Sequence, residues 1–341
     1  MATINNGLLQ QAMEKGWIVS RKHPQDDLYI YNYTAQVQYE RAWNEITLAC
    51  RGLILDAAGN VVARPFPKFF NLGEQSDAVL PAGGFEVFEK MDGSLGILYW
   101  SKGEPYIATR GSFTSDQAQK ANALLYDRYR EAIPLLNPER TYLFEIIYPA
   151  NRIVVDYGDQ EALVLLAVID TESGAEFPPE EIGFPVVKRY NGVKDLSLLK
   201  QLEDPGKEGF VIRFDNNYRL KVKFAEYQRL HWIITQISSI DIWEYLRDNR
   251  SFDELLEKVP DEFYQWVKQT RERLLLQYAG IEQQCRAEFK VLDTRKETAL
   301  YFNTCSYPGL LFSMLNGQDY AGKIWRMLRP AFEKPFAIAE E

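Results

Sequence analysis

A single lysine, Lys90, stands where an apolar pattern breaks, in the stretch from Glu89 to Ser94 that contains Asp92 and Gly93. Apolar runs at residues 85–88 and 97–100 predict a strand on each side, with a turn at Asp-Gly between them. A lysine amine at the edge of such a turn can act as a nucleophile toward a phosphate. An ordinary solvent-exposed hairpin gives the same short pattern, so the rest of the chain has to decide between these two interpretations.

Further charges lie inside strand patterns that are otherwise apolar. Glu145 falls in the run 142–148, Glu208 begins the run 208–214, and Lys221 and Lys223 fall in the run 218–224. Charges rarely face a protein interior unless they are paired or functional. Side chains alternate along a strand, so the two lysines should point the same way. Two ammonium groups on one face repel each other unless an anion lies between them, and a phosphate meets that requirement.

An attack by the lysine of the first motif on a phosphate needs its amine in the neutral form, although the pKa of a free lysine is about 10.4. Neighbouring carboxylates raise that pKa, whereas neighbouring cations, a divalent metal and burial lower it. Asp92, Glu145 and Glu208 therefore make sense together as oxygen ligands of a hydrated Mg²⁺. Lys221 and Lys223 would add positive charge and stabilise the phosphate oxygens as pyrophosphate leaves.

The composition limits the class of protein. The chain has 341 residues and a net charge of -9, so its overall surface is not that of a general nucleic-acid binder, and any polyanion site must be a local basic cleft. Three cysteines and two histidines give neither a disulfide framework nor zinc-ligand spacing, which favours a cytoplasmic location. No apolar run is long enough to cross a bilayer, so we expect no membrane association.

The periodicity of the chain changes near Phe224. Strand patterns dominate before that point, with an amphipathic helix expected at 115–132, whereas helical periodicity runs from Ala225 almost to the end. We therefore expect an α+β fold. Residues 1–224 form an N-terminal domain of twisted antiparallel sheets with flanking helices and a cleft between the sheets, and residues 225–341 form an all-helical C-terminal domain. With no long apolar stripe or heptad, a monomer is expected.

The charged positions belong to an ordered series of motifs. The chain resembles the covalent nucleotidyltransferase superfamily of ligases and capping enzymes and, more narrowly, the bacteriophage T4 RNA ligase 1 family. The similarity spans residues 28–231 in the correct order. The motifs are Tyr31-Asn-Tyr, Cys50-Arg51-Gly, Lys68-Phe-Phe-Asn, Lys90-Met-Asp-Gly-Ser, Phe144-Glu145, Pro149-x-Asn151-Arg152, Glu208-Gly-Phe-Val, Lys221-Val-Lys223 and Leu230-His231.

The resemblance implies a role for each matched residue. Lys90 would form a lysyl-AMP intermediate with ATP. The expected nucleotide contacts are Tyr31 at the nucleotide site, Arg51 and Lys68 on the ATP phosphates, Glu89 beside the adenine mainly through its backbone, Glu145, and Lys221 with Lys223 on the α-phosphate. The expected ligands of Mg²⁺, for which Mn²⁺ is an alternative, are Asp92, Glu145 and Glu208.

The resemblance also implies the acceptor. AMP would pass to an RNA 5'-phosphate, and a 3'-hydroxyl would displace it to seal the strand, in the repair of RNA. Transfer RNA is a candidate substrate, and the helical C-terminal domain a candidate for recognising it.

Two alternatives stay open at this point. A DNA ligase or capping enzyme would share the core motifs, although such enzymes usually append a β-barrel where this chain is helical. A nucleotide- or RNA-binding protein that has lost catalysis is the other alternative, and the complete set of core charges disfavours it.

Overall fold

The computed structural model describes residues 4–74, 80–179, 181–193, 195–204, 206–235, 237–256 and 263–333. The chain divides into two compact units, Met1–Ile234 and Thr235–Glu341. The first unit extends past Phe224 because helix α5 (Ala225–Thr235) packs Tyr227 against the strands that precede it. Within the segment expected to be helical, residues 236, 257–262 and 334–341 lie outside the described residues.

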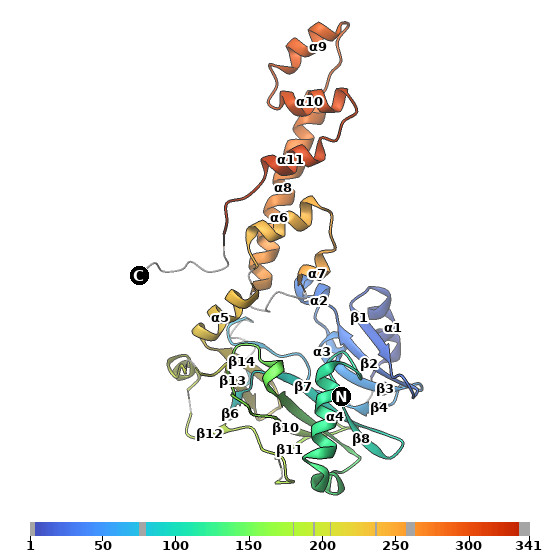
Figure 1. Cartoon of the computed structure of the whole chain (residues 1–341), viewed down its shortest axis with the longest axis vertical. Coiled ribbons are helices and arrows are strands. Elements are labelled where there is room, and N and C mark those ends of the chain that lie inside the picture. The colour runs from blue at the N-terminus through green and yellow to red at the C-terminus, as the bar shows by residue number, and fades with distance from the viewer. Residues whose placement is uncertain are drawn as a thin grey trace. The chain divides into compact units, whose positions relative to one another are not determined.

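The first unit contains three β-sheets (Figure 1). Among the described strands, neighbours pair antiparallel, apart from β14 and β5, which pair in parallel. Sheet A has the order β1 (Ile18–Lys22), β2 (Leu28–Tyr33), β3 (Arg51–Asp56), β4 (Val61–Ala63). Sheet B has the order β12 (Arg189–Tyr190), β6 (Phe85–Lys90), β13 (Gly209–Phe214), β14 (Arg219–Lys223), β5 (Phe70–Asn71). Sheet C has the order β11 (Glu176–Phe177), β10 (Ala162–Asp170), β9 (Arg140–Ile147), β7 (Ser94–Ser101), β8 (Glu104–Thr109).

Sheet C is covered on both faces. Helix α4 (Asp116–Asp127) buries Ala121, Leu124 and Leu125 on one face, against a cluster that includes Leu98 and Phe144. The opposite face packs on sheet A through a second apolar cluster. Alternation along β9 therefore places Phe144 under α4 and Glu145 on the opposite face.

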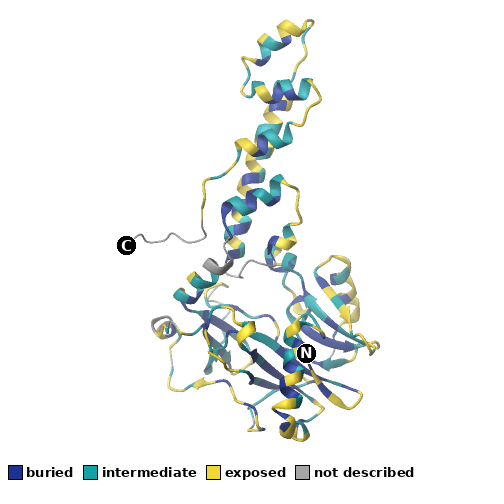
Figure 2. Ribbon diagram, viewed as in Figure 1, coloured by how far each residue is buried: buried dark blue, intermediate teal, exposed yellow. Residues whose placement is uncertain are grey.

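Short helices complete this unit. Helix α1 (Asn6–Glu14) and α3 (Glu45–Ala49) cover sheet A, and α2 (Ala35–Glu40) lies between them in sequence. A 3₁₀ helix at Arg130–Leu135 follows α4, and two more lie at Pro149–Asn151 and Leu196–Gln201. Figure 2 shows that buried residues concentrate along the strands, whereas exposed residues concentrate in the connecting loops.

The chain crosses between sheets at the lysine motif. Strand β6 ends at Lys90 in sheet B, and β7 begins at Ser94 in sheet C. The expected strand, turn and strand are therefore present, but the two strands do not pair with each other as a hairpin. Gly93 is needed for its small size, because a Cβ there would lie 2.6 Å from the backbone oxygen of Ile146. The crossing places Lys90 at the boundary between sheets B and C.

Sheet B has one apolar face and one charged face. The apolar face packs on α5 and the 3₁₀ helix Leu196–Gln201, through residues that include Leu199, Phe210 and Tyr227. On the other face, the register places Lys90 opposite Gly209 and Gly209 opposite Lys223. The next row along the strands contains Phe88, Val211 and Lys221. The predicted common orientation of Lys221 and Lys223 is confirmed.

The second unit is helical in its described part. Its helices are α6 (Ser239–Arg247), α7 (Phe252–Leu256), α8 (Tyr264–Glu288), α9 (Arg295–Phe302), α10 (Pro308–Leu315) and α11 (Ala321–Met327). Capping boxes begin α6 at Ser238 and α9 at Thr294. A core around Cys285, Phe302 and Leu311 joins α8 to α11. The expected α+β class with a helical C-terminal part is confirmed. Among the described helices, none combines the length and the apolar character that a membrane span requires.

Candidate active site

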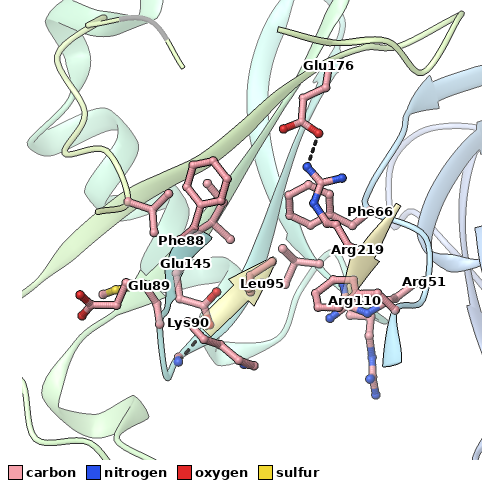
Figure 3. A pocket seen from close by; sticks show the side chains of 16 residues that line it. Arg51, Phe66, Phe88, Glu89, Lys90, Leu95, Arg110, Glu145, Glu176 and Arg219 are labelled. Carbon is pink, nitrogen blue, oxygen red and sulfur yellow. Dashed lines mark hydrogen bonds and ion pairs between the residues drawn. The ribbon is translucent and has the colours of Figure 1, made fainter. Parts of the chain in front are cut away.

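A cavity of about 290 Å³ lies between sheets B and C, with Lys90 in its wall (Figure 3). Its polar lining includes Arg51, Glu89, Arg110 and Glu145, all supplied by segments far apart in sequence. Its apolar lining is Phe66, Phe69, Phe88, Met91, Leu95, Leu166, Val187 and Val211. A largely apolar slot with a few convergent polar groups is the usual form of a small-molecule site.

Lys90 and Lys223 share one buried carboxylate. The Lys90 Nζ lies 2.7 Å from Glu208 Oε2, and the Lys223 Nζ lies 3.5 Å from Glu208 Oε1. Gly209 stands between the two lysines in the sheet register, with φ near +150°. A Cβ at Gly209 would lie 1.9 Å from the backbone oxygen of Val222, so no other residue fits between the strands there. Glycine therefore follows Glu208 in this motif for a steric reason.

Glu145 enters the cavity from sheet C. The Gly93 amide donates a hydrogen bond to its Oε1 at 2.9 Å. Burial raises the pKa of Glu145 to about 7, with Glu208 raising it further, while Lys90, the Gly93 amide and Arg51 act in the opposite direction. Glu145 can therefore exchange a proton near neutral pH beside the lysine.

Two arginines face this lysine across the cavity. Figure 3 shows Arg51 and Arg110 together on the side away from Lys90, with Leu95 between. The Arg51 guanidinium lies 5.6 Å from the centre of the Phe69 ring, and that of Arg110 lies 5.5 Å from the Tyr33 ring. Planar guanidinium groups are suited to binding phosphate oxygens, so this side can receive an anion.

Lys68 lies apart from the described cavity lining, in an aromatic cage. Its Nζ lies 5.8, 5.5 and 5.6 Å from the ring centres of Tyr33, Trp43 and Phe70, and donates to Gln38 Oε1 at 3.3 Å. The side chain is buried. Its predicted contact with the ATP phosphates stays a prediction. The partners of Lys68 in this structure include Gln38 and three aromatic rings. The connection to the cavity runs through Tyr33, whose ring also contacts Arg110.

Tyr31 is placed differently from expectation, whereas Glu89 lies in the cavity wall. Tyr31 packs with Met13 and Trp17 on the side of sheet A that α1 covers, so the structure does not bring it to the cavity. A bulge follows Tyr31 in the pairing of β2 with β3, which sequence alternation could not reveal. The Glu89 carboxylate points away from the cavity in Figure 3 and accepts a hydrogen bond from the Tyr190 hydroxyl at 2.8 Å. Glu89 can therefore face a ligand only through its backbone.

Asp92 is a buried anchor of the lysine loop. Its Oδ2 accepts hydrogen bonds from the amides of Val154 and Val155, both at 2.8 Å. Its Oδ1 accepts one from the Tyr227 hydroxyl at 2.7 Å, and its own amide donates to the Tyr157 hydroxyl at 2.9 Å. Both carboxylate oxygens are engaged, so these contacts favour a bracing role over the metal-ligand role predicted for Asp92.

Two carboxylates at this site are candidate metal ligands. Within the described part of the chain, no group of three or more Asp, Glu, His or Cys residues is placed to hold a metal ion. Glu145 and Glu208 remain beside Lys90 once Asp92 is assigned to its backbone partners. One or two carboxylates with several waters and substrate phosphates are the usual ligands of Mg²⁺, so this pair fits a hydrated ion that arrives with a nucleotide.

Sequence reasoning missed two charged residues of the cavity wall, Glu176 and Arg219. Arg219 follows the same alternation as Lys221 and Lys223, so a signal for its orientation was present in the strand pattern. Glu176 lies on the two-residue strand β11, which carries no periodicity to detect. Tyr157 and Tyr227, which hold Asp92, were missed because their partners are distant in sequence.

The site offers a nucleophile, cations and an apolar slot in one place. Lys90 is the amine, and Lys223, Arg51 and Arg110 supply positive charge for a polyphosphate. Glu145 and Glu208 can hold a divalent ion or accept a proton. The apolar slot between the sheets has the character needed for a nucleobase. Transfer of a nucleotidyl group to a lysine is the reaction that uses all of these parts.

Comparison with known proteins identifies relatives. A family model described as RNA ligase matches residues 49–228. An RNA ligase of Rhodothermus phage RM378 is 26% identical, covering 89% of this chain and 85% of the phage protein. A Thermovibrio ammonificans protein named "Putative RNA ligase" is 30% identical, covering 64% of this chain and 60% of that protein.

A further relative is longer than this chain. A protein of Autographa californica nuclear polyhedrosis virus named "Putative bifunctional polynucleotide kinase/RNA ligase" is 29% identical, and the similarity covers 66% of this chain but 36% of the viral protein. Among solved structures, an archaeal ATP-dependent RNA ligase has 16% identity and a TM-score of 0.45, covering 92% of this chain and 80% of that one.

The family match includes charged residues that line the cavity or pair with its lysine. The matched segment, more than half of the 341 residues, contains Arg51, Lys90, Glu145, Glu208 and Lys223. These are the charged groups that the structure gathers around one apolar slot. By this match, the chain belongs to the RNA ligase family.

Proposed function

We propose that this chain is an ATP-dependent RNA ligase that joins RNA 5'-phosphate and 3'-hydroxyl ends through a lysyl-AMP intermediate on Lys90. The observation that supports this best is the position of the Lys90 amine, in the wall of an apolar cavity and 2.7 Å from a carboxylate that Lys223 shares. Repair of RNA is the process that the resemblance implies, and transfer RNA is one candidate substrate.

The first step forms a bond between the Lys90 Nζ and the α-phosphorus of ATP, and breaks the bond from that phosphorus to the pyrophosphate oxygen. Arg51, Arg110 and Lys223 neutralise charge on the phosphate oxygens as pyrophosphate leaves. The amine proton needs an acceptor, and Glu145, with a pKa of about 7, and Glu208 are the carboxylates within the site. Positive charge that arrives with the nucleotide favours the neutral, nucleophilic form of a lysine amine.

Mg²⁺, or Mn²⁺ in its place, supplies such charge when bound with ATP, and Glu145 and Glu208 would hold it through their oxygens. In the second step the AMP moves to an RNA 5'-phosphate, which restores the free Lys90 amine. In the third step an RNA 3'-hydroxyl attacks that 5'-phosphate, forms the phosphodiester and releases AMP.

Intact-mass measurement after incubation with ATP and Mg²⁺ tests the nucleophile. We expect the wild-type protein to gain one AMP and Lys90→Ala to gain none. An adduct that survives in Lys90→Ala would place the nucleophile elsewhere. Absence of any adduct, even after pyrophosphate treatment has stripped AMP bound earlier, would contradict the ligase function. A nucleotide- or RNA-binding function without catalysis would then remain. RNA and DNA strands with the same ends, offered in parallel, then identify the acceptor.

A further inference from the structure

Four charged side chains form a cluster that crosses between the two sheets of the cavity. We call Glu86, Glu176, Arg213 and Arg219 the inter-sheet cluster. Glu86, Arg213 and Arg219 belong to sheet B, on neighbouring strands β6, β13 and β14, where the register places them in one row. Glu176 belongs to β11, the edge strand of sheet C.

One carboxylate joins the two sheets. Glu176 forms ion pairs with Arg213 through Oε1 and with Arg219 through Oε2. Arg213 in turn pairs with Glu86, so each of its two terminal nitrogens is bound to a different acid. Arg189 on β12 adds a contact to Glu86 at 2.6 Å. The cluster is therefore a continuous bridge from the edge of sheet C across three strands of sheet B.

The bridge lies away from solvent. The side chains of Glu176 and Arg219 are 7% and 9% exposed. Breaking one partner of a buried pair leaves a charge without compensation, so a buried network holds its geometry more firmly than a surface pair does. Arginine strengthens this effect because its planar group fixes direction as well as distance. The separation of the two sheets is thus set at this end of the cavity.

The two arginines also hold the aromatic walls. The Arg219 guanidinium lies 4.3 Å from the centre of the Phe66 ring, and that of Arg213 lies 5.6 Å from the Phe88 ring. Both rings line the cavity, and Figure 3 shows Phe88 and Phe66 on opposite sides of it, with Arg219 beside Phe66 and joined to Glu176. A change in the cluster would therefore move both rings.

The end of the cavity at the inter-sheet cluster and the end at Lys90 differ in their surplus of positive charge. The two acids of the cluster compensate Arg213 and Arg219, and the third arginine, Arg189, is 56% exposed and so screened by solvent. At the Lys90 end, by contrast, Lys223 and the two arginines across the cavity, Arg51 and Arg110, outnumber Glu145 and Glu208. Glu86 lies four residues before Lys90 on one strand, roughly 13 Å away along it. A nucleotide with its phosphates at Lys90 thus directs its flat, uncharged base toward the cluster.

We propose that the inter-sheet cluster positions the nucleobase of ATP by fixing the separation of Phe66 and Phe88. This inference rests on the proposed function of the cavity. Glu176, Arg213 and Arg219 are positioning residues in this proposal, because they act through the two rings. They affect how ATP is held, and they leave the phosphate end unchanged.

The experiment compares Glu176→Gln with wild type in lysyl-AMP formation on the full chain. We expect the KM for ATP to rise about tenfold, the loss that one charge-assisted hydrogen bond can cause, with kcat close to wild type. Tripolyphosphate, a competitor without a base, should inhibit both proteins equally, since it needs only the phosphate end. Glu172→Gln, an exposed glutamate on the turn before β11, is the matched control and should behave as wild type.

The possible results separate the two proposals. No adduct with wild type would remove the proposed function itself, and the cluster's role with it. An adduct with wild type and an unchanged KM in Glu176→Gln would overturn the cluster's role alone. Weaker tripolyphosphate inhibition, or a fall in kcat without a change in KM, would also overturn it, because either result indicates a general structural support. If Glu176→Gln fails to fold, Arg219→Lys, which keeps the charge but loses the planar contact with Phe66, takes its place with the same expectations.

Discussion

The pKa of a single carboxylate, Glu145, is shifted by the sheets that enclose it. Alternation along β9 places it on the cavity face of sheet C, and burial raises its pKa to about 7. Lys90 and Arg51 oppose that increase, although they do not cancel it. The folded protein therefore holds a proton on Glu145 at pH values where an unfolded chain, with the ordinary value of 4.5, has lost it.

This difference predicts how stability changes with pH. Between about pH 4.5 and 7 the folded state binds more protons at Glu145 than the unfolded state, so the free energy of unfolding falls as pH rises through this window. The contribution of Glu145 is present in full below the unfolded pKa and is lost by about pH 7. Its size is at most about 3.5 kcal/mol, because each pKa unit corresponds to 1.4 kcal/mol. Chemical denaturation of the metal-free protein at pH 5, 6 and 7 measures it.

Glu145→Gln removes this titration, so its stability should fall less than that of wild type over the same pH range. Glu131→Gln, at an exposed position on the 3₁₀ helix after α4, controls for the loss of a negative charge and should keep the wild-type slope. Equal slopes in all three proteins would contradict the raised pKa of Glu145.

At the scale of single residues, the sequence predicted the charges that the structure gathers around Lys90. Glu145, Glu208 and Lys223 were recognisable because a charge inside an apolar strand is costly unless it is used. Tyr31 and Asp92 were harder, for physical reasons. A β-bulge lies beside Tyr31, and the partners of Asp92 are backbone amides and a tyrosine far away in sequence.

At the scale of elements, the position of the site depends on which sheet each strand joins. The strands around Lys90 were predicted, but their separation into sheets B and C depends on long-range pairing with β13 and β9. The short helices α2 and α3 and the two-residue strands β5, β11 and β12 were not predicted, because so few residues carry little periodicity. The longer elements were visible in the sequence because each repeats its pattern over several turns or residues.

Helix α5 is the element that holds the lysine loop from the apolar face of sheet B. Its Tyr227 belongs to the apolar cluster of that sheet, and its hydroxyl reaches Asp92 at 2.7 Å. The loop between β6 and β7 is thereby tied to α5 and, through Val154 and Val155, to the segment after β9. The position of Lys90, two residues before Asp92, depends on these ties.

Removing the Tyr227 hydroxyl tests this connection. Tyr227→Phe keeps the ring but leaves a buried carboxylate with one fewer donor, which should lower the free energy of unfolding by about 1–3 kcal/mol. The rate of lysyl-AMP formation should fall as well, because the loop loses a constraint. Thermal unfolding and the rate of AMP incorporation measure the two effects. Tyr106→Phe, on strand β8 with a partly exposed side chain, is the matched control.

A double-mutant cycle with Asp92→Asn decides whether the two residues act through each other. If they do, the double variant should lose less stability than the sum of the single variants. Strict additivity would show that Tyr227 and Asp92 contribute independently, contrary to the hydrogen bond between them.

At the scale of the whole molecule, the chemistry and the helical part belong to separate compact units. Every residue of the cavity lies within Met1–Ile234, together with the apolar clusters that support sheets A, B and C. The second unit has its own core around α8 and α11. A unit with its own core can keep its fold when its neighbour is removed.

A chain shortened to end at Thr235, after helix α5, should therefore fold and form lysyl-AMP at a rate within about threefold of the full chain, because the cavity and its supports are retained. Sealing of RNA should fall much further if the second unit, the candidate for RNA recognition, binds the RNA. Intact mass reports the first activity and gel analysis of labelled RNA the second. Lys90→Ala in the shortened chain controls for AMP bound without a covalent bond.

Loss of both activities in a shortened chain that keeps its cooperative unfolding would show that the helical unit contributes to nucleotide transfer itself. Full sealing activity would show instead that the first unit recognises RNA without help.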